Sequence, residues 1–389
     1  MITFENVTKR YPEAGGRSAG STLSGTTAVD SLNLNIEAES FTVFVGPSGC
    51  GKTTSMRMIN RMITPTSGVI TVNGKNIAES DAVKLRRGIG YVIQSAGLLP
   101  HRTVVDNVAT VPVLRGTSRR AARTAALGVL ERVGLDPAFA DRYPAQLSGG
   151  QQQRVGVARA LAADPPILLM DEPFSAVDPV VREDLQTEML RLQAELKKTI
   201  VFVTHDIDEA VRLGDRIAVF GTGGRLQQYD RPEVVLSSPA TDFVASFVGR
   251  DRGYRGLSFR SADAVPVHDI DTSPVEKLDG LRLEQGQWVL VVTADRAPLG
   301  WIDVTGVEGI RAGRSVQEST AAGGSLFTVG GDLRQALDAA ISSPSGIGVA
   351  VDESGAVVGS LDGSEILEHL AAQRRAEDEA RNEHHFGSL

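Results

Sequence analysis

Apolar positions along the first 249 residues fall into short runs, and segments with helical spacing separate these runs. Residues 2–7 alternate apolar and polar side chains, which predicts a half-buried strand. Further strands are predicted at 32–36, 41–45, 89–93, 167–170, 199–204 and 216–220. The helical segments lie at 57–63, 118–133, 151–163 and 180–197. Strands that alternate with helices are typical of an α/β domain with a mainly parallel sheet.

Two features interrupt this pattern near the start of the chain. Residues 12–27 are rich in glycine, serine and threonine and hold few apolar side chains, so we expect a flexible loop there. The helix at 57–63 is expected to stop at Pro65, because proline cannot continue the helical hydrogen bonding.

The pattern changes after Gly249, where two strand–turn–strand pieces recur at 288–302 and 347–361. A helix at 332–342 precedes the second piece and another at 363–372 follows it. We interpret this as a weak internal repeat in a separate α+β module. Residues 373–389 are charged and lack a core-forming pattern, which predicts a flexible tail. The chain is therefore divided into 1–249, 250–372 and 373–389.

Composition excludes several classes of protein. A single cysteine, Cys50, cannot form an internal disulfide or a multi-cysteine zinc site. We expect no secretory signal and no membrane span, since no apolar run approaches the roughly 20 residues that a span needs. Residues 1–249 hold 27 Lys and Arg against 26 Asp and Glu, whereas residues 250–389 hold 13 against 22. The near-neutral first region lacks the basic surface typical of nucleic-acid binding.

A glycine-rich motif of the form GxxxxGK[ST] follows the strand at 41–45 and opens a helix. Glycines let main-chain N–H groups surround phosphates, and the helix N-terminus favours negative charge. Lys52 neutralises phosphate charge and the Thr53 hydroxyl can ligate Mg²⁺. The predicted ATP-binding residues of this motif are Gly46, Pro47, Ser48, Gly49, Cys50, Gly51, Lys52, Thr53 and Thr54.

A second acidic motif ends the apolar strand at 167–170. Asp171 suits a contact to Mg²⁺, and Glu172 suits a general base that orients the attacking water. A strand that ends in two carboxylates is commonplace by itself and is usually structural. Together with the phosphate-binding loop, it indicates nucleotide hydrolysis.

The sequence Leu147-Ser148-Gly149-Gly150-Gln151 stands just before a helix and 20 residues before Asp171. Here the chain resembles the ATP-binding subunits of ABC transporters, whose signature is LSGGQ. The resemblance implies a P-loop NTPase fold, the ABC cassette, in which two subunits sandwich two ATP molecules. The signature residues Ser148, Gly149, Gly150 and Gln151 would then face the ATP of the partner cassette. Taken alone, Ser-Gly-Gly is also a plain helix N-cap.

The same resemblance assigns further residues of the site. Gln94 corresponds to the Q-loop glutamine that senses Mg²⁺ and water, Asp178 to the D-loop aspartate and His205 to the switch histidine. Tyr11 resembles the aromatic residue that stacks on adenine, although the loop at 12–27 is longer than usual and leaves its placement open. The implied catalytic residues are Glu172, His205 and Gln94, and the implied Mg²⁺ ligands are Thr53, Gln94 and Asp171.

Closer resemblance comes from residues 55–61, 90–94 and 170–179. These segments look like the ATPase subunits of importers for glycine betaine, carnitine, choline and proline betaine. Members of that group often end in a pair of cystathionine-β-synthase-type (CBS) repeats, and the pieces at 288–302 and 347–361 resemble a degenerate pair. In the family such repeats regulate transport through ionic strength or a nucleotide such as cyclic di-AMP. A plain dimerisation module is the alternative.

The resemblance also implies partners and a location. We expect a homodimer of cassettes on the cytoplasmic face of the membrane, a separate integral-membrane permease, and an extracellular or lipid-anchored solute-binding protein. Exposed apolar residues in the segment 95–100 suggest the groove for the permease. Two other functions stay open: import of another solute such as an amino acid or polyamine, and a non-transport ABC ATPase that acts on nucleic acid.

Overall fold

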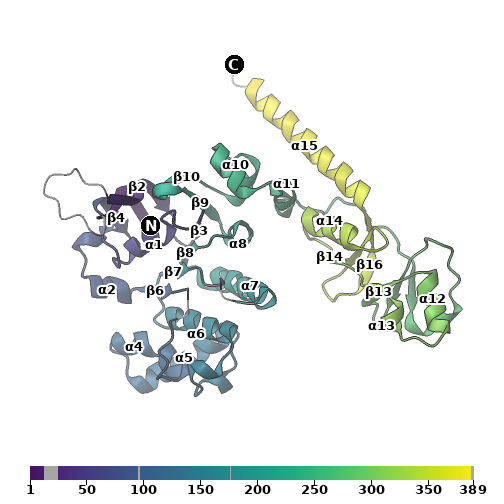
Figure 1. The fold of residues 1–389 in the computed structure, drawn as a ribbon, viewed down its shortest axis with the longest axis horizontal. Helices are drawn as coiled ribbons and strands as arrows, with labels where there is room; N and C mark the ends of the chain where they lie inside the picture. Colours follow the sequence, from purple (N-terminus) through teal and green to yellow (C-terminus); the bar gives the residue numbers. More distant parts are fainter. Residues whose placement is uncertain (13–24, 95–96, 176, 387–389) are drawn as a thin grey trace. The chain divides into compact units, whose positions relative to one another are not determined.

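The computed structural model describes residues 1–12, 25–94, 97–175 and 177–386 of the 389-residue chain (Figure 1). It divides into two compact units, Met1–Arg250 and Asp251–Leu389. In the described part of the chain, no helix combines the length and the apolar character that crossing a membrane requires.

A six-stranded sheet forms the centre of the first unit, in the order β10-β9-β3-β8-β7-β6. Neighbouring strands are parallel except for β10, which pairs antiparallel with β9. All five residues of β3, β7 and β8 are buried, as the apolar runs predict. The mainly parallel α/β architecture is therefore confirmed. The strands are β3 (Phe41–Val45), β6 (Ile89–Val92), β7 (Ile167–Asp171), β8 (Thr199–Val203), β9 (Arg216–Gly221) and β10 (Arg225–Asp230).

A second, antiparallel sheet has the order β2-β1-β4-β5. Its strands are β1 (Ile2–Pro12), β2 (Gly25–Ile36), β4 (Ser67–Val72) and β5 (Lys75–Asn76). The prediction of a loop over 12–27 is wrong at both ends. Tyr11 pairs with Thr26 and Pro12 with Gly25, because ladder pairing between the two strands continues past the apolar pattern. The rest of the predicted loop, 13–24, lies outside the described residues.

Three of the four predicted helices of the first unit, at 118–133, 151–163 and 180–197, match observed helices within two residues at each end. Six further α-helices in the described part of this unit were not predicted, and the fourth prediction differs in its bounds. Helix α1 begins at Lys52 and ends at Ile59, so the predicted segment 57–63 is wrong in its bounds. Arg61 has a φ of +54°, a left-handed conformation that ends the helical path before Pro65. The helices are α1 (Lys52–Ile59), α2 (Ala82–Arg87), α3 (Val104–Val108), α4 (Thr110–Leu114), α5 (Arg119–Arg132), α6 (Gly149–Leu161), α7 (Pro179–Leu196), α8 (Ile207–Leu213), α9 (Pro232–Ser237) and α10 (Asp242–Val248).

Two apolar clusters pack against the faces of the central sheet. Phe41 and Phe202 belong to the cluster that includes residues of α3, α5, α6 and α7. Phe44 and Phe220 belong to the other cluster, which joins the central sheet to the antiparallel sheet and α1. Phe41 and Phe44 lie on opposite faces of β3, because side chains alternate along a strand. The cores thus fix α1 and the strand ends that carry the polar motifs.

The second unit contains two three-stranded sheets with the same topology. In each, the first two strands are parallel and the last two form an antiparallel hairpin with a register shift beside its turn. Gly300 and Gly359 occupy equivalent positions in the two hairpins. The elements are α11 (Arg252–Arg255), β11 (Thr272–Pro274), β12 (Val289–Val292), β13 (Pro298–Ile302), α12 (Val304–Arg311), α13 (Val316–Ser319), β14 (Leu326–Thr328), α14 (Leu333–Ser342), β15 (Ile347–Val351), β16 (Val357–Asp362) and α15 (Gly363–Phe386).

The last helix is longer than expected. Helix α15 continues to Phe386, whereas a helix to residue 372 and a flexible tail were predicted. Residues 373–386 contain neither glycine nor proline and are rich in alanine, arginine and glutamate. These residues have high helix propensity, so the helix continues without an apolar pattern.

Candidate active site

The loop between β3 and α1 can be built only with glycine at key positions. Gly46, Gly49 and Gly51 have φ angles of +149°, +77° and +99°, in the region that side chains disfavour. A Cβ on Gly46 would lie 2.3 Å from the carbonyl oxygen of Phe220, and one on Gly51 would lie 2.2 Å from that of Ala28. The motif therefore forms the compact turn that a phosphate-binding loop needs.

Lys52 is buried at the end of this loop. Its Nζ donates hydrogen bonds to the carbonyl oxygens of Gly46 (2.6 Å) and Pro47 (2.9 Å) and lies 3.8 Å from Cys50 Sγ. The Cys50 side chain is also buried, and burial raises the pKa of its thiol. The ammonium group of Lys52 therefore contacts only neutral groups of its own loop. A buried charge needs a counter-ion, and a bound phosphate group would supply one.

Thr53 and Asp171 meet at the start of α1 and the end of β7. Thr53 Oγ1 donates a hydrogen bond of 2.8 Å to Asp171 Oδ1, and Arg57 Nη2 donates one of 3.1 Å to Asp171 Oδ2. Arg57 Nε also donates to the hydroxyl of Tyr91 (3.1 Å). Sequence reasoning missed Arg57 and Tyr91. Arg57 is four residues after Thr53, so helical spacing could have placed both on one face of α1.

Glu172, His205 and Gln94 come together from three strand ends. Glu172 Oε2 lies 3.3 Å from His205 Nδ1 and 3.4 Å from Gln94 Nε2. Glu172 has a φ of +45°, a conformation that costs a non-glycine residue about 1–2 kcal/mol. Its N–H donates to the Val203 carbonyl at 2.9 Å, which fixes the backbone in this conformation beside the strand that leads to His205.

One further residue contacts this group and was not predicted. Ser175 Oγ donates to the Glu172 carbonyl oxygen at 3.0 Å and accepts from Gln94 Nε2 at 3.4 Å. It therefore links the turn after Glu172 to the Q-loop glutamine. Its position three residues after Glu172 could have indicated that Ser175 lies beside the site.

The signature segment begins α6. Ser148 Oγ accepts a hydrogen bond from Gln151 N (3.3 Å), and Gln151 Oε1 accepts one from Ser148 N (3.0 Å), which forms a capping box. Gly149 and Gly150 form the first helical residues. The structural interpretation of this segment as an N-cap is thus confirmed, while contact with a partner's ATP stays a prediction.

Tyr11, Thr54 and Asp178 occupy the edges of the site. Tyr11 is exposed on β1, with Lys9 Nζ 5.0 Å from its ring centre. It pairs with Thr26 of β2, the strand whose Ala28 approaches Gly51, so the ring lies on a strand beside the loop. Thr54 is the third residue of α1, and the Asp178 carbonyl accepts from Arg182 N (2.8 Å). Adenine stacking by Tyr11 and the role of Asp178 stay predictions.

The donor set fits Mg²⁺ and a nucleoside triphosphate. Thr53, Asp171 and Gln94 offer a hydroxyl, a carboxylate and an amide oxygen, the hard ligands that Mg²⁺ prefers. The glycine loop, the helix N-terminus and the buried Lys52 supply positive potential for phosphates. Glu172 sits beside them as a carboxylate able to accept a proton from water.

Comparisons with known proteins agree with this geometry. The ABC transporter family model matches residues 29–175. The osmoprotectant import ATP-binding protein OsmV of Salmonella typhimurium is 46% identical over 309 residues, which cover 78% of this chain and 79% of the relative. The choline transport ATP-binding protein OpuBA of Bacillus subtilis is 45% identical over 314 residues, covering 78% of each chain.

Solved structures support the same fold. A dimeric ATP-binding cassette in a post-hydrolysis state, bound to ADP and Pi, has a TM-score of 0.54 and 35% identity, and the match covers 60% of this chain and 99% of that chain. The cbiO1 protein of Clostridium perfringens, part of an ABC transporter complex, has a TM-score of 0.56 and 27% identity, with 67% and 94% covered. The first unit is therefore an ABC cassette, and the chain is an ATPase.

The similarity to OsmV spans 309 residues, more than the 250 residues of the first unit, so it does not stop at the cassette. The chain belongs to the family of ATP-binding subunits of ABC transporters that serve the import of osmoprotectants such as glycine betaine, carnitine and choline.

Proposed function

We propose that this chain hydrolyses ATP at the cytoplasmic face of a membrane to energise uptake of a quaternary-amine osmoprotectant through a separate permease. The observation that carries the proposal is the combination of a complete hydrolytic cluster, Glu172 with His205 and Gln94, and relatives named for osmoprotectant, choline and carnitine transport. A solute-binding protein outside the membrane would deliver the solute.

The chemistry follows from the groups already described. Glu172 accepts a proton from the attacking water, and Gln94 and His205 hold its carboxylate in place. Lys52 offsets the negative charge on the phosphoryl oxygens. When bound, Mg²⁺ supplies further positive charge to the phosphates, and Thr53, Asp171 and Gln94 are the residues that would hold it.

A homodimer completes the site in this proposal. The start of α6, with Ser148 at its N-cap, presents a helix N-terminus that suits the γ-phosphate held by a partner cassette. The first of the similar solved structures described above is itself a dimer. Each subunit would therefore supply both a phosphate loop and a signature segment.

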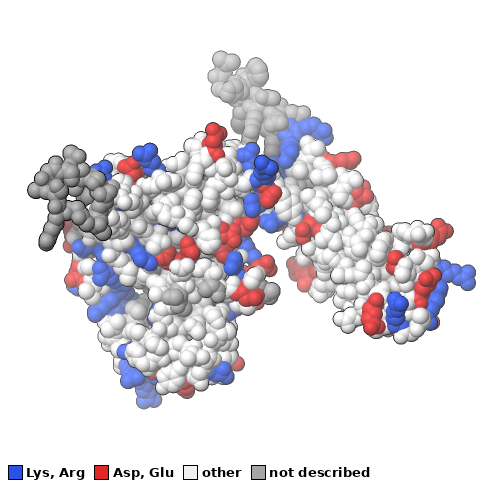
Figure 2. All heavy atoms as spheres, in the orientation of Figure 1, with Lys and Arg blue, Asp and Glu red and all other residues white. Residues whose placement is uncertain are grey.

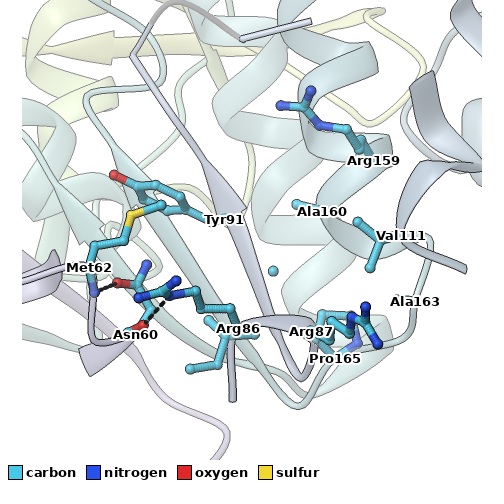
Figure 3. A pocket seen from close by; sticks show the side chains of 12 residues that line it. Asn60, Met62, Arg86, Arg87, Tyr91, Val111, Arg159, Ala160, Ala163 and Pro165 are labelled. Carbon is cyan, nitrogen blue, oxygen red and sulfur yellow. Dashed lines mark hydrogen bonds between the residues drawn. The ribbon is translucent and has the colours of Figure 1, made fainter. Parts of the chain in front are cut away.

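The permease would dock at a pocket of about 250 Å³ beside the Q-loop segment. Figure 3 shows Tyr91, Met62 and Asn60 on one side of this pocket and Val111 and Arg159 on the other. Arg159 donates to the Gly97 carbonyl oxygen at 2.7 Å, which joins the pocket to the segment predicted for docking. A recess with apolar walls and basic groups suits a short amphipathic helix of the permease.

One detail of the docking prediction needs correction. Leu98 and Leu99 are half-buried and not exposed, because the buried Asn107 holds the segment down. Asn107 Oδ1 accepts from Leu99 N (2.7 Å) and its Nδ2 donates to Leu99 O (3.1 Å). Residues 95 and 96 of the same segment lie outside the described residues.

The second unit would regulate transport as a degenerate CBS pair. Its support is the shared strand topology and register of the two sheets; the first sheet has a short 3₁₀ helix, Val275–Gly280, where the second has α14. Residues 250–389 hold 13 Lys and Arg against 22 Asp and Glu, and Figure 2 shows side chains of both signs on this unit. An acidic module can respond to ionic strength, whereas a bound regulatory nucleotide would need its own site.

ATPase stimulation separates the proposal from an ABC ATPase that acts on nucleic acid. We expect reconstituted permease to raise the ATPase rate and DNA or ribosomes to leave it unchanged. Stimulation by nucleic acid with none by permease would overturn the proposed transport role.

A further inference from the structure

A buried polar network joins helices α7 and α8 close to the site. Its centre is Glu209 on α8, which is 7% exposed. Glu209 Oε1 accepts a hydrogen bond of 3.4 Å from Gln186 Nε2 of α7, and Gln186 Oε1 accepts one of 3.1 Å from Arg212 Nη1. None of these residues belongs to the motifs of the cassette already described.

One arm of the network ends on the residues that flank His205. Thr204 Oγ1 donates a hydrogen bond of 2.6 Å to Glu209 Oε2 and accepts one of 3.0 Å from Asp206 N. A hydroxyl has one proton, so its donation to Glu209 turns the lone pairs toward Asp206 N–H. Glu209 thereby fixes the backbone on both sides of His205.

The other arm ends on Val177 and Asp178, which are called the D-loop here. Arg182, in the first turn of α7, donates from Nη2 to the Val177 carbonyl oxygen (3.3 Å) and from its main-chain N to the Asp178 carbonyl oxygen (2.8 Å). Its Nε lies 3.9 Å from Glu209 Oε1, too far for a hydrogen bond. Arg182 Nε is buried and has no hydrogen-bond partner among the described residues.

The Arg182–Glu209 pair carries two costs in folding free energy, so we do not expect stability to be its main role. A buried carboxylate is expensive to desolvate, and burial raises the pKa of Glu209. A buried N–H without an acceptor is expensive as well. A small displacement of the Arg182 side chain toward Glu209 would close the 3.9 Å gap and satisfy that donor.

We propose that Arg182 and Glu209 are positioning residues that couple the D-loop to the backbone around His205. The inference rests on the ATPase activity of the proposed function and is independent of the solute or the permease. Movement of the D-loop would be transmitted from Arg182 to Glu209 and Thr204, and so to the histidine beside Glu172.

The test uses the full-length chain and four variants: Glu209→Gln, Arg182→Met, their double variant, and Gln193→Met as a control. Glu209→Gln keeps an acceptor for Thr204. Gln193 also lies on α7 and donates to the Glu39 carbonyl oxygen (2.9 Å), outside the network. Turnover and KM for ATP are measured, with thermal unfolding and the His205 imidazole NMR signal of the nucleotide-free protein.

We expect each single variant to lower kcat about tenfold with KM changed less than about twofold, and the double variant to fall no further than the worse single variant. The His205 signal should shift in Glu209→Gln and stay in place in Gln193→Met. Multiplied losses in the double variant, an unmoved His205 signal or an unchanged kcat would overturn the coupling. A wild-type chain without ATPase activity would instead contradict the proposed function.

Discussion

Thr53 on α1 and Asp171 at the end of β7 are joined by a 2.8 Å hydrogen bond that spans 118 residues of sequence. It brings the phosphate loop and the acidic strand end together. Arg57 completes the arrangement with its 3.1 Å contact to the other oxygen of Asp171. A cation of the protein itself thus holds Asp171, one of the residues proposed to bind Mg²⁺.

Arg57→Met should therefore destabilise the nucleotide-free protein, because the buried Asp171 loses its charged partner. We expect the free energy of unfolding to fall by about 1–2 kcal/mol, below the value for fully buried pairs since Arg57 is partly exposed. Millimolar Mg²⁺ should stabilise this variant more than the wild type, and a chelator should reverse the gain. Urea unfolding measures both effects, with Lys84→Met as a control; equal Mg²⁺ responses would contradict the account.

Glu172→Gln should abolish steady-state hydrolysis and still permit ATP-dependent dimerisation. An amide cannot accept the proton from water, and removal of a general base lowers turnover by about 10²–10⁴-fold. Phosphate release measures the first effect and size-exclusion chromatography with ATP measures the second. Unchanged turnover would remove Glu172 from the catalytic role.

The pH dependence of stability should contain a contribution from Glu209. Burial raises the pKa of this carboxyl above the ordinary 4.5, so the folded state holds its proton more tightly than the unfolded state. Stability from this group is present below pH 4.5 and is lost as pH rises through the higher folded pKa. Glutamine does not titrate, so Glu209→Gln has no such loss. In urea unfolding between about pH 5 and about pH 8, the free energy of unfolding of the variant should rise relative to that of the wild type as pH increases. A constant difference would contradict the assignment.

Truncation after Arg250 should leave ATP hydrolysis within about twofold and flatten its response to salt. Under the proposed function, an anionic membrane would repel the acidic second unit, and salt would screen this repulsion over a Debye length of about 10 Å at 0.1 M. ATPase activity of the reconstituted complex, read against ionic strength with the full chain beside the truncated one, measures the effect. The same salt response in the full-length and the truncated chain would show that the second unit does not sense ionic strength.

Local sequence information was enough for the five parallel strands of the central sheet and for the phosphate loop, but not for β10. Gln94 and His205 were assigned only through the resemblance to ABC transporter subunits. The apolar runs of β3 and β7 and the glycines around Lys52 can each be recognised from a few consecutive residues. The contact between Arg57 and Asp171 could not be predicted in this way, because 114 residues separate them in the sequence. Glu209 lies only five residues after Thr204, but nothing in the local pattern indicates that their side chains meet. The extension of β2 to Gly25 likewise depends on pairing with Pro12, which no local pattern records.

ATP-driven uptake of radiolabelled glycine betaine by the complex reconstituted with its permease and solute-binding protein tests the central claim most directly. The account predicts uptake that requires ATP and is lost in Glu172→Gln, with competition by unlabelled carnitine, choline or proline betaine. Uptake of none of these quaternary amines, by a complex whose ATPase is active, would contradict it.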